Sequence, residues 1–478
     1  MVKKTKKVKK VSKEKAPKKG LHSVYENLMD NIEKEFGLSS SDLVSHKISS
    51  GLASVDLVLG GGYGSGFHVI SGQEQSGKST EAAHLLKESL KHDIPIRRLE
   101  DAEGTVDPRY TNHIFGVKRL SDIFGIRDKK GNWIQPAKIR YSDKNVIEDV
   151  FNSLIKTVNR LPDKVYRSDH DQWYFVLEPN DKRTTTFASE LGSFDKQLKS
   201  KTGNLWFPTD NPWPQAVIVI DSLPAMITES IDEKEENSRG MALMARAFSE
   251  NLPRLVGKLR SKNVVIFAVN QIREKPGVMF GSPFYEPGGN AIKFYSRSRN
   301  QIFARAVPQE WRSNGSTSQY SVEKSLLGDG VDEYAFKHLR NVKNKMGSPY
   351  LDCWTRVWIK DHKGLGRGFD PVFDTWIALQ HAGYATESKS KGVRSLQFDQ
   401  DLPKSLDDLS KKQVSWPEFK ALILGHEPLA PREVKDLCYK AEKARKVSSK
   451  SIRNRLMHLI NNGQAQYNPI AKSKESKE

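Results

Sequence analysis

Short apolar runs alternate with helical spacings along most of this chain. From residue 45 to about 385, the runs FHVISG, AVIVIDS and VVIFAVNQ are separated by stretches with helical periodicity, among them 78–91 and 239–260. Runs of this kind are typical of strands buried on both faces, and the helices between them indicate crossover connections. The pattern predicts an α/β fold with a mainly parallel sheet.

The first 44 residues do not follow this alternation. Residues 1–20 form a Lys-rich stretch with too little apolar content to fold, and we expect a disordered tail. In residues 21–44, apolar side chains recur at helical intervals, which predicts a short amphipathic helix and linker outside the main core. Such a helix needs a partner surface.

Three further segments divide the rest of the chain. Residues 161–214, approximately, lack clear periodicity within the expected core of 45–385, and we interpret them as an insertion. Residues 386–412 are predicted to be a polar linker. Residues 413–478 contain amphipathic stretches such as KSIRNRLMHLINN and are predicted to form a small basic helical C-terminal module.

The charge balance favours a polyanionic partner such as nucleic acid, because the formal net charge is +19. Residues 1–19 alone hold ten Lys and one Glu. This tail could raise DNA affinity by counterion release, act as a localisation signal, or be a solvated extension.

Cysteine content and hydropathy indicate in which cellular compartment the protein is expected. The two cysteines, Cys353 and Cys438, lie far apart in the sequence, so we expect no disulfide framework or zinc site but two small buried hydrophobes. The chain has no apolar run of about 18 residues, and its basic N-terminus is not followed by an apolar segment. We therefore expect a cytoplasmic protein, in a nucleoid or viral replication compartment, that is neither secreted nor bound to membranes.

A phosphate-binding loop is predicted between a strand and a helix. The string GQEQSGKST satisfies G-x-x-x-x-G-K-[ST] in the required context. Its backbone N–H groups and the helix N-terminus would face the phosphates. Lys78 would meet the β and γ oxygens, and the Ser79 hydroxyl would bind Mg²⁺. The candidate cofactor-binding residues here are Gly72, Gln73, Glu74, Gln75, Ser76, Gly77, Lys78, Ser79 and Thr80.

Two sets of acidic residues complete the candidate chemistry. Asp221 ends the apolar run AVIVID, where a carboxylate would hold the Mg²⁺ of ATP through water. Hydrolysis also needs a group that orients or deprotonates water. The run IRRLEDAEGTVDPRY offers Asp101, Glu103 and Asp107, and periodicity does not choose among them.

In order from about residue 24 to 384, these strings resemble the RecA/UvsX family of DNA strand-exchange recombinases. Similar strings are NIEKEFG, ISSGLASVDLVLGGGYGSG, DAEGTVDPRY, VIVIDSLPAM, VNQIREKPGVMFGSPFYEPGGNAIKFY and VKNK. The resemblance implies a RecA-like P-loop NTPase core with an N-terminal polymerisation helix. It also implies an ATPase, using ATP and Mg²⁺, that forms helical filaments on single-stranded DNA and exchanges strands with duplex DNA.

The resemblance also implies roles for single residues. Glu103 would be the catalytic carboxylate, Tyr110 would stack on adenine, and Gln271 would sense the γ-phosphate. Lys343 and Lys345 would reach the nucleotide of a neighbouring protomer, like arginine fingers supplied in trans. The residues expected to contact DNA are Met241, Arg246, Arg273, Lys275, Met279, Phe280, Gly288, Gly289 and Asn290.

The resemblance places these residues in two DNA-binding loops, and the second loop runs from Ile272 to Asn290. Its physical logic holds without the family, because its basic residues neutralise phosphates and its apolar side chains can part successive bases. Departures from the family fall in the same regions. The first DNA-binding loop, TESIDEKEENSRGMALMAR, contains the acidic residues Asp232, Glu233, Glu235 and Glu236, which would repel phosphate. Phe284 and Tyr285 could stack on bases or only pack the second loop.

The C-terminal module departs from the acidic tail of typical bacterial members. Its basic helices suggest capture of duplex DNA, as against a solvated face, through Lys443, Arg445, Lys446, Lys450, Arg453 and Arg455. The insertion and divergent ends resemble a phage-encoded member. Loading and single-strand-binding proteins are conceivable partners.

Two other classes share much of this pattern. A hexameric RecA-fold DNA helicase would use the same loop and carboxylates, but gives no reason for the VMFG string or the detached N-terminal helix. A non-catalytic recombination mediator or scaffold would be expected to lose Lys78, Glu103 or Gln271, and all three are present.

Overall fold

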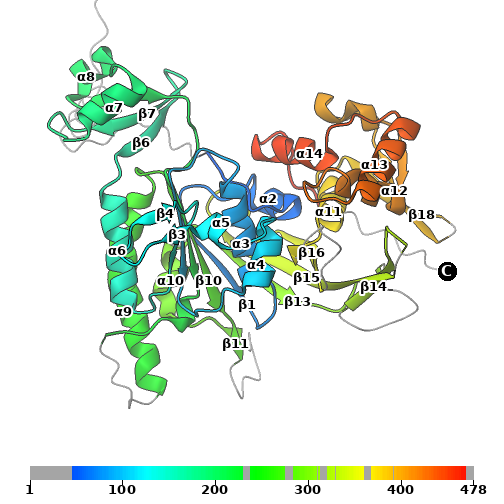
Figure 1. Cartoon of the computed structure of the whole chain (residues 1–478), viewed down its shortest axis with the longest axis horizontal. Coiled ribbons are helices and arrows are strands. Elements are labelled where there is room, and N and C mark those ends of the chain that lie inside the picture. The colour runs from blue at the N-terminus through cyan, green and yellow to red at the C-terminus, as the bar shows by residue number, and fades with distance from the viewer. Residues whose placement is uncertain are drawn as a thin grey trace, which may run out of the picture.

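The computed structural model describes residues 46–229, 237–274, 284–308, 311–312, 320–328, 330–359, 368–390 and 392–469. The expected tail and polymerisation helix, 1–44, lie outside these ranges. Figure 1 shows a central sheet with one small unit above its edge and a second unit beyond its other end.

The central sheet has ten strands in the order β17-β16-β15-β13-β1-β10-β9-β2-β5, with β14 paired to β15. In this order, each neighbouring pair from β13 through β1, β10, β9 and β2 to β5 is parallel. The pairs that involve β14, β15, β16 and β17 are antiparallel. The bounds are β1 Gly66–Gly72, β2 Ile96–Asp101, β5 Arg140–Ser142, β9 Ala216–Asp221, β10 Val264–Gln271, β13 Ser298–Ala304, β14 Tyr320–Lys324, β15 Val331–Asn344, β16 Asp352–Trp358 and β17 Gly368–Phe369. The predicted α/β class with a mainly parallel sheet is confirmed.

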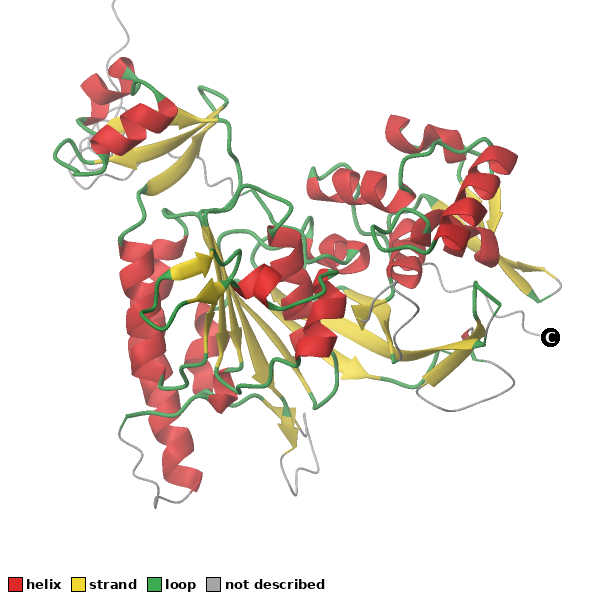
Figure 2. Cartoon of the chain, viewed as in Figure 1, coloured by secondary structure: helices red, strands yellow, loops and turns green. Residues whose placement is uncertain are grey.

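Helices cover both faces of the parallel part, as Figure 2 shows. Along β9, Ile218 and Ile220 pack toward α6 and α9, whereas Val217 and Val219 pack toward α3. Successive side chains of a strand point to opposite faces, so a strand covered on both sides must be apolar throughout. The helices around this core are α2 Ala53–Leu59, α3 Lys78–Ser89, α4 Pro108–Phe115, α5 Ser121–Phe124, α6 Ile147–Asn159, α9 Asn237–Leu259, α10 Gly289–Tyr295 and α11 Pro371–His381, with the 3₁₀ turn η1 Leu223–Ala225.

Two short hairpins extend from the sheet. Strands β3 Ile126–Arg127 and β4 Trp133–Gln135 pair beside the edge strand β5, and β11 Arg273–Glu274 pairs with β12 Phe284–Tyr285. The half-buried Phe284 and Tyr285 therefore face a strand partner in this hairpin.

Residues 163–209 form the small unit above the edge of the sheet. It consists of an antiparallel sheet in the order β6-β7-β8 with two helices, and it has its own apolar clusters. Lys164 joins this unit to the main core, because its Nζ donates a hydrogen bond to the Trp213 carbonyl over 2.6 Å. The elements are β6 Asp163–Arg167, β7 Gln172–Leu177, α7 Thr184–Leu191, α8 Lys196–Thr202 and β8 Leu205–Thr209.

The prediction of a linker at 386–412 is wrong. This segment contains β18 Ala385–Ser390, β19 Val393–Phe398 and the 3₁₀ helix η3 Lys404–Leu409, and β19 pairs with β20 Gln413–Ser415. Leu396 and Phe398 are buried in one cluster with α11. The stretch looks polar in sequence because only one face of this antiparallel sheet packs on the core.

Three helices complete the C-terminal unit: α12 Trp416–Leu424, α13 Arg432–Arg445 and α14 Ile452–Asn461. Phe419 and Leu456 share a cluster with Trp376 of α11, so this unit packs on the end of the main core. Cys353 and Cys438 are both free and buried. Of the helices described, none combines the length and apolar character needed to span a bilayer.

Candidate nucleotide site

The phosphate-binding loop connects the end of β1 to the start of α3. Gly77 precedes the helix with φ of 103°, and Gln75 has φ of 56°. A Cβ on Gly72 would come within 2.4 Å of both the Ile302 carbonyl oxygen and the Ser76 Oγ. The buried Ser76 hydroxyl has no hydrogen-bond partner among the described residues. The loop is therefore folded closely around a row of backbone groups, which fits the binding of phosphate.

Lys78 and Ser79 meet the acidic end of β9. Asp221 accepts a hydrogen bond from the Ser79 hydroxyl, and burial raises the Asp221 pKa to about 6. The nearby carboxylates of Glu103 and Asp101 contribute to this rise, whereas the Ser79 hydrogen bond and Lys78 oppose it. Burial lowers the pKa of Lys78, and the carboxylates of Asp221, Glu103 and Glu74 oppose this in part. A hydroxyl beside a desolvated carboxylate is a donor set that suits Mg²⁺.

The structure separates the three candidate catalytic acids. The Ser222 hydroxyl donates a hydrogen bond of 2.5 Å to Glu103 Oε1, which places this exposed carboxylate beside Asp221. Asp101 instead accepts bonds from the backbone of the loop that follows and from the Tyr141 hydroxyl. Asp107 caps α4 by accepting from the Tyr110 backbone. The two rivals therefore hold the local backbone, and the geometry favours Glu103.

Gln271 and Tyr110 lie near the two ends of the loop sequence, at Gly72 and Thr80. Gln271 ends β10 directly beside Gly72 of β1, and the following backbone N–H donates to the Gly72 carbonyl over 3.1 Å. The hydroxyls of Tyr110 and Thr80 are 2.5 Å apart. Both expected residues thus border the phosphate-binding loop.

A second lysine contacts the loop, and the sequence reasoning missed it. Lys337 of β15 donates from Nζ to the Gln75 carbonyl over 2.7 Å, and it is only 6% exposed. Burial and the neighbouring Lys78 lower its pKa. Its only signal in the sequence is a charged residue between the apolar positions of the run YAFKHL.

Lys343 lies near the C-terminal end of β15, and Lys345 directly follows the strand. Lys343 is six positions after Lys337, or about 20 Å along an extended strand. Its Nζ donates to the carbonyls of Lys293 and Phe294 at the end of α10. Burial, Lys345 and Arg299 lower the Lys343 pKa to about 8. The structure does not bring these lysines to the phosphate-binding loop of their own chain.

The expected DNA contacts are only partly described. Lys275, Met279 and Phe280 lie outside the described residues, as do the acidic positions 232–236 and the side chain of Met241. Arg273 begins β11. Arg246 forms an exposed ion pair of 2.8 Å with Glu250, one turn along α9.

The paired glycines have a packing role. Gly288 and Gly289 have φ of 91° and 78°, and they start α10. A Cβ on Gly288 would lie 2.3 Å from the Ile292 Cδ1, and one on Gly289 would lie 2.9 Å from the Ala245 Cβ. They let α10 pack closely on α9, and the exposed Asn290 follows them.

Half of the basic residues expected on the C-terminal module are engaged within the chain. Arg445 pairs with Glu418 at 2.8 Å, Arg453 with Asp374 at 2.6 Å and Arg455 with Asp408 at 2.6 Å. We therefore no longer assign these three arginines to a DNA-binding surface. Their guanidinium groups hold the module together and attach it to α11. Lys443, Lys446 and Lys450 remain exposed.

Comparison with known proteins finds similarity to RecA. A model described as the RecA N-terminal domain matches residues 214–352, which span β9 to the start of β16. RecA of Acholeplasma laidlawii is 28% identical over 394 residues, covering 80% of this chain and 93% of that protein. The chain is thus similar to RecA proteins over most of its length.

Other RecA-family relatives align over different lengths. RecA of Clostridium tetani is 28% identical over 357 residues, covering 73% of this chain and 82% of that protein. RecA of Thermus aquaticus is 28% identical over 222 residues, 44% of this chain and only 58% of that protein. The central sheet is accordingly a RecA-like fold. These relatives are bacterial, so they give no support to the expected phage origin.

Proposed function

We propose that the protein is an ATP-dependent recombinase, which forms helical filaments on single-stranded DNA and pairs and exchanges homologous strands. One observation carries the proposal. Lys78, Ser79, Glu103, Asp221 and Gln271 meet at the carboxyl ends of four neighbouring parallel strands, β1, β2, β9 and β10.

Each of these residues has a separate task in ATP hydrolysis. Lys78 and the loop N–H groups hold the β and γ phosphates, and Ser79 and Asp221 hold Mg²⁺. The metal supplies positive charge at the phosphate oxygens. Glu103 orients and deprotonates the attacking water. Gln271 contacts the γ-phosphate and couples this contact to the conformation of the loop that starts at Arg273.

The filament role rests on the lysines that do not reach their own loop. Lys343 and Lys345 act on the nucleotide of a neighbouring protomer, so bound ATP becomes part of the interface and favours assembly. DNA lies along the segments that follow β9 and β10, where Arg246, Arg273 and Asn290 are the described candidates. Lys275, Met279 and Phe280 complete this proposed surface.

The test is ATP hydrolysis with and without single-stranded DNA, with electron microscopy of the same mixtures. We expect stimulation by DNA together with helical filaments, followed by strand exchange in a pairing assay. Lys78→Ala should abolish ATP-dependent assembly, whereas the control Lys91→Ala, on the exposed turn after α3, should not. Closed rings would favour the helicase, and DNA binding without hydrolysis would favour the scaffold.

A further inference from the structure

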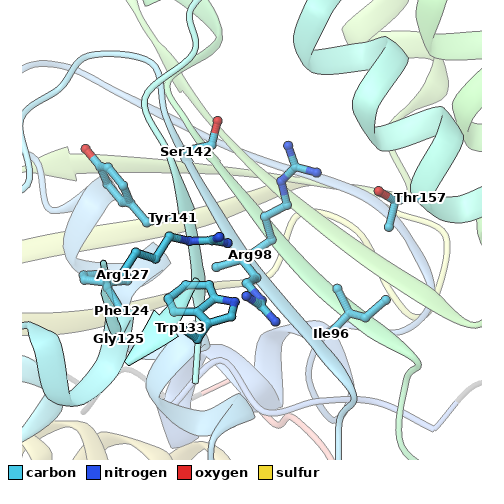
Figure 3. A pocket seen from close by; sticks show the side chains of 10 residues that line it. Ile96, Arg98, Phe124, Gly125, Arg127, Trp133, Tyr141, Ser142 and Thr157 are labelled. Atoms are coloured by element: carbon cyan, nitrogen blue, oxygen red, sulfur yellow. The ribbon is translucent and has the colours of Figure 1, made fainter. Parts of the chain in front are cut away.

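A pocket of about 590 Å³ lies at the β5 edge of the central sheet. Its walls come from β2, β5, α6 and the β3–β4 hairpin, and none of the phosphate-binding loop lines it. Figure 3 shows Arg98, Arg127 and Trp133 together near the centre of the view, with Tyr141 on one side and Ile96 and Thr157 on the other. The volume is in the range of small-ligand sites.

The charge in this pocket is unbalanced. Arg98 and Arg140 are direct partners on the adjacent strands β2 and β5, so their side chains lie on one face. Like charges directly opposite each other on a sheet destabilise it. The buried Glu100 pairs with Arg98. In the described part of the chain, no carboxylate lies within ion-pair distance of Arg127 or Arg140, and no lining residue is acidic.

Trp133 holds the two unpaired guanidinium groups in place. The Arg127 Cζ lies 3.8 Å from the centre of a Trp133 ring, and the Arg140 Cζ lies 4.6 Å from it. Arg127 also donates to the Gly131 carbonyl of the same hairpin over 2.5 Å. Stacking on an aromatic ring fixes the plane of a guanidinium while leaving its N–H edge free for an anion.

We propose that this pocket binds a nucleotide unit through its phosphate, as a site separate from the ATP site. Planar guanidinium groups match the oxygens of a phosphate in a bidentate manner. The apolar ring of Phe124 and the ring of Tyr141 offer contact for a base or sugar. The nucleotide unit could be free or could belong to a DNA strand, and the chemistry of recognition is the same.

The experiment measures binding of labelled dTMP to the full chain by equilibrium dialysis without ATP. This ligand lacks the β and γ phosphates that the P-loop recognises. The test variant is Arg127→Gln/Arg140→Gln. The matched control is Lys129→Gln/Lys130→Gln, which makes the same charge change in the exposed turn of the same hairpin, outside the pocket. Circular dichroism verifies that both variants stay folded.

We expect saturable binding of one dTMP per chain, weakened at least tenfold in the test variant and unchanged in the control. Competition with unlabelled (dT)10 then distinguishes a DNA strand from a free nucleotide as the natural ligand. Displacement of the bound dTMP by (dT)10 assigns the site to a DNA strand, whereas unchanged dTMP binding assigns it to a free nucleotide. Absence of dTMP binding at millimolar concentration, or equal weakening in both variants, would overturn the proposal. Either failure would leave ATP hydrolysis at the P-loop untouched.

Discussion

The Lys337 ammonium donates a 2.7 Å hydrogen bond to the backbone carbonyl of Gln75, within the phosphate-binding loop of the same chain. The loop is thus held by β15 as well as by its own strand and helix. Burial and the nearby cation of Lys78 both lower the pKa of Lys337. This contact links the antiparallel part of the sheet to the nucleotide site.

Replacing Lys337 with Met should weaken nucleotide affinity at least tenfold, because a charged hydrogen bond of roughly 1.5 to 3 kcal/mol is lost from the loop. Calorimetric titration with ATP measures this. Lys164→Met is the matched control, since Lys164 is also buried and donates to a backbone carbonyl, but at the insertion. Equal losses of affinity in both variants would point to general destabilisation.

Replacing Glu103 with Gln should slow ATP hydrolysis by roughly 100-fold or more, the usual contribution of a general base. Nucleotide affinity should change little, because the amide keeps the size of the side chain. Asp107→Asn is the control, since Asn can also cap α4. The ATP turnover rate of both variants tests this prediction. Normal turnover by Glu103→Gln would show that Glu103 is not the catalytic carboxylate.

Replacing both Lys443 and Lys450 with Gln should weaken duplex binding and make it less sensitive to salt. If both contact phosphates, the slope of log K against log salt should fall by about 1.8. Fluorescence anisotropy with a labelled duplex gives this slope. Arg445→Gln should instead lower the stability of the module, because its partner Glu418 loses an ion pair. An unchanged slope in the double lysine variant would mean that this face is only solvated.

Asp56 should make stability depend on pH. It is fully buried, and burial raises its pKa to about 7 despite hydrogen bonds from Ser49 and Ser50. The folded state therefore keeps the proton to higher pH than the unfolded state. Its stabilising contribution is complete below the unfolded pKa of about 4, falls by up to about 1.4 kcal/mol per pH unit, and is lost as the pH passes 7.

Thermal unfolding between pH 4 and pH 8 measures this effect. The midpoint of the native protein should fall as the pH rises, and Asp56→Asn should lose that part of the dependence. Asp122→Asn is a control at a more exposed carboxylate. Parallel pH profiles for the native protein and Asp56→Asn would contradict the prediction.

The sequence by itself determined the main architecture. Strands such as AVIVID carry no polar side chain before their last residue, because both faces of the parallel sheet are covered by helices. The tight loop between β1 and α3 was predictable because the glycines of GQEQSGKST allow a local turn there. Asp221 was predicted from its place at the end of an apolar run, and Gln271 from the family resemblance.

Only the tertiary structure decided which distant groups meet. Lys337 contacts Gln75, and Arg453 pairs with Asp374. These partners lie far apart in the sequence, and the periodicity of apolar residues does not indicate that they meet. The supposed linker at 386–412 folds because the apolar face of β19 finds α11 as its partner. Likewise, Arg98 and Arg140 oppose each other through the register of β2 and β5. Helix and strand propensity and the alternation of apolar and polar residues depend on neighbouring residues in the sequence. Strand register and the packing of one element on another depend instead on which surfaces become buried together.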